Sequence, residues 1–345
     1  MIHAMLLAAG LGTRLRPVTD SLPKPAVPFL NVPLLNWSVE LLRDGEIAKW
    51  TINTHHLHDT LLPLIQRTGQ AIKNEFAISH EQNQPLGSGG GVRTAFERGH
   101  FRGAQTILIA NADEVILPIR KNLIARFLES HRQSGAIVTL LTMDHPDAGT
   151  KFGAVWTDAN GAVHGFGRDG TLFSRAPYPK HYVGVIAIDA SVLEKMPTGE
   201  SNLLYDTLQN EIRSGASVRV FNEPLVWFET GNVADYLSAT REILHLLSPT
   251  QANSPLSHAR AQALRVLGAW HPGEVGFWEH EAGARALYSK LQDGSLPFTE
   301  LMSVLAKEKA FAVYGDNTLA KAPLINAVSL PDSVVSKKTE NTISL

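Results

Sequence analysis

The stretch LLAAGLGTRLRPVTDSLPKPAVP, residues 6–28, decides the fold. Its apolar start ends in Ala8 and Ala9, as a buried strand would. The glycines that follow permit a turn with positive φ, and they let main-chain N–H groups approach phosphate oxygens. Arg14 adds a planar guanidinium for phosphate, and Lys24 adds a second cation. The stretch therefore predicts a strand followed by a phosphate-binding turn.

The spacing of this turn separates it from two other phosphate-binding loops. The P-loop requires GxxxxGK[ST], which does not occur here. The dinucleotide pattern G-x-G-x-x-G is interrupted because Leu15 occupies the third glycine position. The sequence therefore disfavours a dinucleotide-dependent oxidoreductase.

Short apolar runs alternate with helical patterns along the first 247 residues. Continuous Val/Ile/Leu/Ala runs are typical of strands buried on both faces of a parallel sheet, and the alternation implies right-handed crossovers. We predict an α/β fold, a three-layer α/β/α sandwich with a mostly parallel, Rossmann-like sheet. The expected strands are Ile2–Ala9, Trp50–Asn53, Phe76–Ser79, Thr106–Ala110, Ala136–Thr142, Gly153–Thr157, Tyr182–Ile188 and Ser217–Phe221. The expected helices are Asn36–Asp44, Asp59–Gln66, Gly91–Arg98, Leu123–Ser134, Asn202–Ser214 and Val233–Leu247.

A polar, proline-containing linker at residues 248–257 predicts a domain boundary. We expect residues 1–247 to form the catalytic domain and residues 248–345 a small C-terminal region, helical from His258 to Ala312. Trp270, Phe277 and Trp278 are its expected aromatic packing anchors. In the tail after Tyr314, small and β-branched residues recur about every six positions, which suits one or two coils of a β-helix. An irregular tail is the alternative, and the region's role is open between oligomerisation, regulation and a second substrate contact.

Bulk composition excludes several classes of function. The net charge is −2 with dispersed cations, so no broad surface for nucleic acid is expected. The absence of cysteine excludes disulfides, thiolate catalysis and Cys-ligated metals. The first apolar run is too short to span a bilayer and lacks a basic segment before it. We expect a cytoplasmic protein without a membrane partner.

Leu7–Pro33 resembles the opening signature of the sugar-phosphate nucleotidyltransferases, LAAGxGTRLxPxTxxxPKPxxPxxxxP. The resemblance covers residues 1–247 and implies the nucleotide-diphospho-sugar transferase fold. It also implies a cytoplasmic Mg²⁺-assisted enzyme of sugar nucleotide and cell-envelope polysaccharide biosynthesis, which joins a sugar 1-phosphate to an NTP. Arg14 would promote pyrophosphate loss and Lys24 would bridge the reacting phosphates. The nucleotide cradle implied by the resemblance consists of Leu7, Ala8, Ala9, Gly10, Gly12, Thr13 and Arg14.

A second segment, HEQNQPLGSGGG at residues 80–91, resembles the family's base-and-ribose loop. A glycine run at a helix start offers N–H groups to an oxygen-rich ligand. We expect Glu81 or Gln82 to read the edge of the base, and Gly87 to contact the nucleotide. A flexible surface loop with a hinge at residues 89–91 is the alternative. The base is open between uracil and guanine, so UTP and GTP are the expected triphosphates.

Two acidic residues occupy positions that the resemblance assigns to a metal. Asn111-Ala112-Asp113 stands where the family has N-G-D, which implies that Asn111 contacts the nucleotide and Asp113 binds Mg²⁺. Glu229 stands where a second metal-binding aspartate is usual, one methylene longer. If the missing glycine requires positive φ, Ala112 would strain the loop. The alternative for Glu229 is an exposed strand residue.

The sugar side of the site is implied by three further positions. Gly153 lies in a segment similar to the family's Y-G-V-V, and Gly184 in one similar to N-x-G-I-Y. The usual E-K-P is replaced by Gly165–Asp169, where Arg168 is expected to hold the sugar phosphate unless it is an exposed turn residue. This trait resembles the subgroup acting on N-acetylmuramic acid 1-phosphate or mannose 1-phosphate.

His55, His56 and His58 fit no common zinc spacing, so we interpret them as a polar loop near the pocket. The sequence leaves one functional alternative to the enzyme. A catalytically degenerate relative would bind a sugar nucleotide and act as a sensor or partner subunit. Ala112, Glu229 and the missing E-K-P favour that alternative. If the protein is a homo-oligomer, the C-terminal region is expected to form the contact between the copies.

Overall fold

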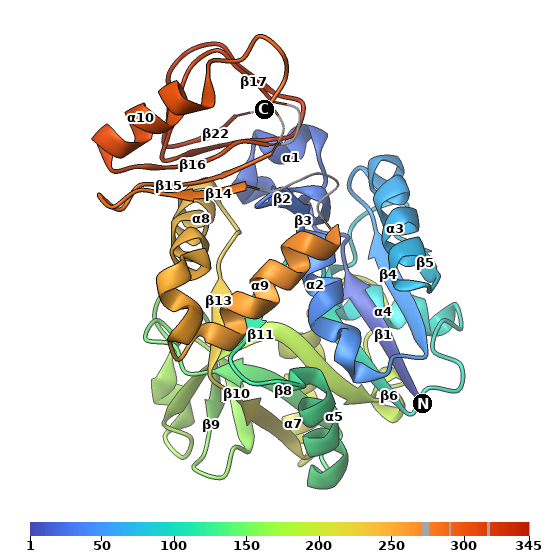
Figure 1. The fold of residues 1–345 in the computed structure, drawn as a ribbon. Helices are drawn as coiled ribbons and strands as arrows, with labels where there is room; N and C mark the ends of the chain where they lie inside the picture. The colour runs from blue at the N-terminus through green and yellow to red at the C-terminus, as the bar shows by residue number, and fades with distance from the viewer. Residues whose placement is uncertain (271–275, 290, 316–317, 345) are drawn as a thin grey trace. The chain divides into compact units, whose positions relative to one another are not determined.

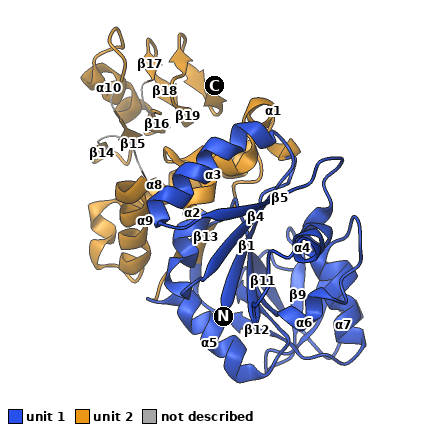
Figure 2. Ribbon diagram, turned by 90° about the vertical axis from the view of Figure 1, so that its right-hand side faces the viewer, with its two compact units in different colours: residues 1–11, 38–116, 121–225 blue, residues 12–37, 117–120, 226–345 orange. Residues whose placement is uncertain are grey.

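The computed structural model describes residues 1–270, 276–289, 291–315 and 318–344. The chain forms two compact units, coloured separately in Figure 2. Unit 1 comprises residues 1–11, 38–116 and 121–225, and unit 2 comprises residues 12–37, 117–120 and 226–345. The units do not coincide with a boundary at Leu247, because the phosphate-binding turn and the helix Val233–Leu247 group with the C-terminal region.

The main sheet of unit 1 contains nine of the described strands (Figure 1). Its continuous path is β10-β9-β11-β6-β1-β4-β5, and β8 joins β11 to β12. β1 pairs in parallel with β4 and β6, and β4 with β5, whereas β11 is antiparallel to β6, β8 and β9. The strands are β1 (Ile2–Leu7), β4 (Lys49–Thr54), β5 (Phe76–His80), β6 (Thr106–Asn111), β8 (Val138–Met143), β9 (Ala154–Thr157), β10 (Val163–Gly167), β11 (Tyr178–Asp189) and β12 (Val218–Asn222).

Helices lie on both faces of this sheet, as the alternation of side chains along its strands shows. Ile107 and Ile109 of β6 belong to a buried cluster with Val92 of α4. Phe221 of β12 contacts Phe127 of α5, with ring centroids 5.9 Å apart, whereas its neighbours at 218 and 220 join the first cluster. The three-layer prediction is therefore confirmed. The helical segments of this part are α2 (Leu34–Leu42), η3 (Arg43–Gly45), α3 (His58–Ile72), α4 (Gly87–Glu97), α5 (Leu123–Ser134), η4 (Gly170–Phe173), α6 (Ala190–Leu193), η5 (Leu203–Leu208) and α7 (Gln209–Arg213).

The parallel strands end together at one edge of the sheet. Leu7 is level with Asn53 of β4 and with Asn111 of β6, and Thr54 is level with His80 of β5. Ligands of α/β sheets bind beyond the carboxyl ends of the strands. This edge therefore positions the candidate residues of unit 1.

Unit 2 joins the segment after β1 to the end of the chain. The Nδ2 of Asn31 donates to the carbonyl of Tyr314 at 3.2 Å, and the Tyr236 hydroxyl donates to the carbonyl of Pro28. Burial raises the pKa of Tyr314 to about 12, although the hydrogen bond that its hydroxyl accepts from the Leu324 amide acts in the opposite direction. The elements of this part include η1 (Thr13–Leu15), α1 (Val18–Ser21), η2 (Lys24–Ala26), β2 (Pro28–Phe29), β3 (Val32–Pro33), β7 (Val115–Pro118), β13 (Leu225–Phe228), α8 (Val233–Leu247), η6 (Pro249–Asn253) and α9 (Ser257–Trp270).

The C-terminal tail forms stacked parallel coils. Ala312 pairs with Ala327, residue 319 with 334, and residue 324 with 339, always with an offset of fifteen residues. Three short strands per coil thus stack in three ladders, whereas the sequence left a β-helix and an irregular tail both open. The strands and the remaining helix are β14 (Gly276–Glu279), β15 (Arg285–Tyr288), α10 (Phe298–Glu308), β16 (Phe311–Val313), β17 (Leu319–Ala320), β18 (Leu324–Ile325), β19 (Ala327–Ser329), β20 (Val334–Val335), β21 (Thr339–Glu340) and β22 (Ile343–Ser344).

The helical prediction for His258–Ala312 is only partly correct. Helices α9 and α10 occur, but Phe277 and Trp278 lie on strand β14 rather than on a helix. This strand pairs antiparallel with β15, so its residues alternate between two faces. Among the described helices, none is long and apolar enough to cross a membrane.

Candidate active site

A buried hydrogen-bond network joins three strand ends in unit 1. The amide of Ala8 donates to Oδ1 of Asn53 at 2.7 Å, and Nδ2 of Asn53 donates to Oε1 of Glu81 at 2.6 Å. The second oxygen of Glu81 accepts the amide of Leu86 at 2.7 Å. Glu81 is only 2% exposed. The network therefore fixes the loop after β5 against the end of β1.

The network changes the expected role of Glu81. Both of its carboxylate oxygens bind groups of the protein, so a direct contact with a base would break an existing hydrogen bond. Gln82 is exposed in the same loop and leaves its amide to solvent or ligand. Sequence reasoning missed Asn53, although an asparagine at the end of a buried strand was a signal that a polar partner lies there.

The glycine run packs inside the first turns of α4 rather than forming a free hinge. Gly87 has φ +70, and the amides of Gly89 and Gly90 donate to the carbonyl of Ser201. A Cβ on Gly91 would lie 2.7 Å from Oε1 of Glu81. The glycines are therefore required for close packing, and the flexible-hinge alternative is wrong for residues 89–91.

Asn111 and Gly184 meet beside the end of β6. Nδ2 of Asn111 donates to Oε1 of Glu114 at 3.0 Å. Gly184 has φ +82, and a Cβ on it would lie 2.7 Å from Nδ2 of Asn111. Asp113 lies half-buried in the turn between Asn111 and β7. The structure thus brings Asn111, Asp113 and Gly184 to one end of the sheet.

Ala112 does not strain this turn. Its amide donates to the carbonyl of Leu7 at 3.0 Å, and its side chain is fully buried. It is not among the described residues with positive φ. The expectation that Ala112 strains the loop is therefore wrong, because this turn needs no left-handed residue at position 112.

Glu114 is a second acidic residue at this edge, which sequence reasoning missed. Ser38 and Glu114 exchange two hydrogen bonds at 3.2 Å, one through each backbone group of Glu114. Burial, and then the negative charge of Glu114, raise the pKa of Tyr182 far above its usual range. Because Glu114 directly follows Asp113 in the chain, the sequence does not indicate which of these two carboxylates faces a ligand.

The phosphate-binding turn lies in unit 2. Gly12 adopts the left-handed conformation, with φ 62, immediately before η1. Its carbonyl accepts the hydroxyl of Thr19 at 2.8 Å, and a Cβ on Gly12 would lie 3.2 Å from Cβ of Lys24. Arg14 is exposed, whereas Lys24 is half-buried at the start of η2. The fold therefore brings Lys24 against the glycine turn.

Glu229 lies beside Arg14 in the same unit. Its Oε1 accepts the amide of Gly231 at 2.6 Å. A Cβ on Gly231 would collide with that oxygen and would lie 2.8 Å from Nη2 of Arg14. The half-buried Glu229 is thus neither fully exposed nor remote from the phosphate-binding turn.

The sugar-side positions lie at the ends of β9 and β10. Gly153 is exposed immediately before β9, and a Cβ on it would lie 3.4 Å from the hydroxyl of Tyr205. Arg168 is exposed in the bend that follows β10. Tyr205 was not singled out from the sequence, since its helical position resembles many surface tyrosines.

The predicted polar loop of His55, His56 and His58 lies beside Glu81 and His80. Nδ1 of His55 lies 2.6 Å from the carbonyl of Glu81. The rings of His58 and His80 lie with their centroids 3.8 Å apart and their planes tilted by 31°, and both contact the hydroxyl of Thr54. Burial and the neighbouring His80 lower the pKa of His58. The described residues contain no group of three or more His, Cys, Asp or Glu side chains placed to hold a metal.

The sequence of the chain is similar to those of known proteins. The family model for nucleotidyl transferases matches residues 3–245. The chain is 30% identical over 253 residues to UTP–glucose-1-phosphate uridylyltransferase from Synechocystis sp., covering 70% of this chain and 63% of that protein. It is 27% identical to mannose-1-phosphate guanyltransferase from Emericella nidulans, covering 74% and 67%. The chain thus spans less than two thirds of the first of these relatives.

Solved structures share the fold at lower sequence identity. UDP-glucose pyrophosphorylase complexed with UDP-glucose superimposes with a TM-score of 0.58 at 16% identity, covering 70% of this chain and 98% of that one. The inositol-1-phosphate CTP transferase from T. maritima gives 0.55 at 18% identity, covering 70% and 96%.

Proposed function

The chain belongs to the nucleotidyl transferase family, and from this premise we propose that it joins a sugar 1-phosphate to a nucleoside triphosphate. An oxygen of the sugar phosphate attacks the α-phosphorus, the bond from that phosphorus to the bridging oxygen breaks, and pyrophosphate leaves. The observation that carries the proposal is the phosphate-binding turn, where Gly12 has a left-handed backbone and Lys24 packs against it. A phosphate monoester is already anionic at pH 7, so the reaction needs positioning and charge neutralisation rather than a general base.

Each part of the candidate site has a role in this reaction. Arg14 and Lys24 offset the charge of the phosphates. Ala8 and Ala9 are small enough for a base to lie against the backbone, and Gln82 reads its edge. Glu81 supports these contacts by holding Asn53 and the loop, which accounts for its burial.

Mg²⁺ is part of the proposal, with Asp113 and Glu229 as its protein ligands. Glu229 uses one oxygen for the amide of Gly231, which leaves the other for a cation. Because the described residues offer no larger acidic cluster, an ion would take its other ligands from phosphates and water, as Mg²⁺ does at nucleotide sites. When bound, the ion would supply positive charge to the reacting phosphates. Asp113 and Glu229 would hold it, while Arg14 and Lys24 keep their own contacts.

The triphosphate is proposed to be UTP or GTP. One similar protein is named for uridylyl transfer and another for guanylyl transfer, so the comparisons support both bases. Pyrophosphate release with each of four NTPs and a panel of sugar 1-phosphates tests the reaction and the base together. Release with one triphosphate and one sugar class supports the proposal, and no release with any pair contradicts it.

A sensor or partner subunit is the second candidate, favoured by one observation. Glu229 lies beside the guanidinium of Arg14, where an ion pair would compete with both metal and phosphate. Calorimetric titration of the same NTPs separates the candidates. Binding of a triphosphate without pyrophosphate release under any condition would favour the sensor.

Assembly and location are further expectations that accompany the proposed reaction. A location in the cytoplasm would give the enzyme access to nucleoside triphosphates. The stacked coils from β16 to β22 are the proposed oligomer contact, because β22 ends the ladder β16-β19-β22 and its outer edge has no partner strand among the described residues. Light scattering of the full chain over a range of concentrations measures its oligomeric state directly.

A further inference from the structure

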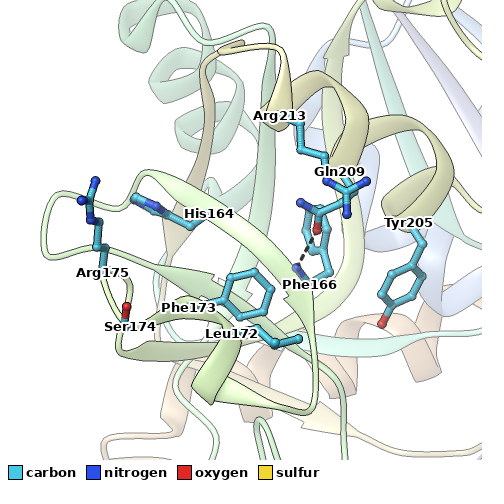
Figure 3. A pocket seen from close by; sticks show the side chains of 9 residues that line it. All are labelled: His164, Phe166, Leu172, Phe173, Ser174, Arg175, Tyr205, Gln209 and Arg213. Atoms are coloured by element: carbon cyan, nitrogen blue, oxygen red, sulfur yellow. Dashed lines mark hydrogen bonds between the residues drawn. The ribbon is translucent and has the colours of Figure 1, made fainter.

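Unit 1 contains a pocket that none of the proposed roles uses. It has a volume of about 670 Å³ and lies among β10, the η4 turn and the helical pair η5 and α7. In Figure 3, Phe166, Phe173 and Leu172 lie at the centre, with His164 and Arg175 on one side and Tyr205 on the other. A pocket of this size holds a sugar unit or a similar small molecule.

The pocket is built by contacts between its own walls. The rings of Phe166 and Tyr205 meet edge to face with centroids 6.3 Å apart, and Phe173 stacks on Trp156 at 6.0 Å. The amide of Phe166 donates to Oε1 of Gln209 at 3.3 Å, which ties β10 to α7. A Cβ on Gly165 would collide with Phe173, so only glycine at this position keeps the ring where it is.

Its mouth exposes apolar side chains to water. Leu172 is 74% exposed and Tyr205 is 49% exposed, and both line the pocket. An apolar patch around a concave site is typical of a binding surface, and aromatic faces suit the C–H groups of a sugar ring.

The permanently charged side chains that line the pocket are all positive. Arg175, Arg213 and His164 line the pocket, and no Asp or Glu is among the nine lining residues. Arg175 and Arg213 are both exposed, so their guanidinium groups are accessible from solvent. Arginine forks match carboxylate and phosphate groups, so the pocket suits an anionic ligand with an apolar face.

The pocket adjoins the proposed sugar side of the active site. The hydroxyl of Tyr205 lies 3.4 Å from the Cβ position of Gly153. Phe166 lies two residues before Arg168, which is expected to hold the sugar phosphate. A sugar held at Gly153 and Arg168 would therefore have this pocket next to it.

We propose that the pocket receives an anionic group carried by the sugar, a carboxylate or a second phosphate, and makes the chain selective for acidic sugar 1-phosphates. This inference rests on the proposed transfer reaction. Phe166 and Tyr205 border the apolar side of the group, and Arg175 and Arg213, on opposite sides of the pocket in Figure 3, surround its charge with positive charge.

The test compares sugars that differ only in charge. Pyrophosphate release is measured with glucose 1-phosphate, glucuronic acid 1-phosphate and glucose 1,6-bisphosphate, using the full chain and its Arg175→Gln/Arg213→Gln double variant. We expect the full chain to prefer one or both anionic sugars, which identifies carboxylate or phosphate as the group. We expect the double variant to lower the anionic-to-neutral ratio of kcat/KM about tenfold, since each exposed ion pair contributes up to about fivefold.

Arg67→Gln is the matched control, because Arg67 is an exposed arginine of α3 in the same unit and is not part of the lining. Its ratio should equal that of the unchanged chain. A preference for the neutral sugar, or an equal loss for all three sugars in the double variant, overturns the inference. If no sugar releases pyrophosphate, the proposed reaction fails, and titration of glucuronic acid 1-phosphate and glucose 1,6-bisphosphate into both proteins decides about the pocket. Binding that depends on the arginines supports it, and equal or absent binding overturns it.

Discussion

At the scale of single residues, Gly231 shows how tightly the phosphate-binding turn is packed. Its missing side chain lets the Glu229 carboxylate and the Arg14 guanidinium approach the same backbone position. We predict that Gly231→Ala displaces one of them and lowers kcat by about ten- to a hundredfold, less than the roughly hundred- to thousandfold loss when such a stabilising group is removed altogether. Steady-state pyrophosphate release measures the loss.

Gly268→Ala is the control for that substitution. Gly268 lies on α9 in the same unit, and a Cβ there would meet no atom within 4 Å. Alanine in place of this helical glycine should leave kcat unchanged and add up to about 1 kcal/mol to the free energy of unfolding. Full activity of Gly231→Ala would show that Arg14 does not need its present position.

Ala112 gives a second prediction at this scale. Because its backbone does not require glycine, Ala112→Gly should not raise turnover by more than about twofold. The substitution removes a fully buried methyl group and adds backbone entropy to the unfolded chain, so we expect it to lower the free energy of unfolding by about 1–2 kcal/mol. Urea denaturation and pyrophosphate release are the measurements. A tenfold gain in turnover would restore the view that Ala112 impairs the turn.

At the scale of elements, Asn53 connects the ends of β1, β4 and β5. Asn53→Ala would leave the amide of Ala8 and one oxygen of Glu81 without their partners. Each buried group left unsatisfied costs about 1–3 kcal/mol, so the free energy of unfolding should fall by about 2–4 kcal/mol. Triphosphate affinity, measured by calorimetry, should fall with it because the loop after β5 loses its anchor.

Gln82→Ala separates loop order from base recognition. Gln82 is exposed in the same loop, so its removal should change the free energy of unfolding by less than about 0.5 kcal/mol. Its effect should appear instead in the ratio of affinities for UTP and GTP. An unchanged ratio would remove Gln82 from base recognition, and an unchanged stability of Asn53→Ala would contradict the proposed network.

Sequence periodicity was sufficient for eight of the nine strands of the central sheet and for several helices. The predicted Leu123–Ser134 and Val233–Leu247 have the observed bounds, since their apolar faces repeat with helical spacing. Short or glycine-rich elements were missed for physical reasons. In β10 two glycines interrupt the apolar pattern, and in β14 the aromatic residues resemble helix anchors until a partner strand pairs with them.

The sequence was sufficient to predict most residues of the candidate site, but not the contacts between them. The glycine turn, Arg14 and Lys24 are adjacent in sequence, so their shared role follows from local spacing. The partnership of Asn53 with Glu81 joins residues of different strands and becomes visible only when those strands pair. Likewise, the glycines at 89 and 90 serve a packing contact with the chain near Ser201, which no local pattern indicates.

At the scale of the whole molecule, burial of histidines links stability to pH. The pKa values of His3, His58, His100, His131 and His181 are lowered mainly by burial. At His181, burial and then the neighbouring His145 lower the pKa to about 4. A histidine whose folded pKa is depressed is neutral in the folded chain while the unfolded chain takes up a proton. Stability is therefore lost as the pH falls below about 6.5, the unfolded value, and the loss is complete below the folded value.

For His181 this linkage predicts a loss of about 2 kcal/mol in the free energy of unfolding between pH 8 and pH 5. His181→Gln removes the titrating group and should flatten that part of the pH dependence, whatever it does to stability at pH 8. Urea denaturation of both proteins at several pH values gives the two slopes. His245→Gln is the control for a histidine-to-glutamine change as such, because His245 is an exposed residue of α8. Equal slopes for the unchanged chain and His181→Gln would mean that His181 takes up its proton without unfolding.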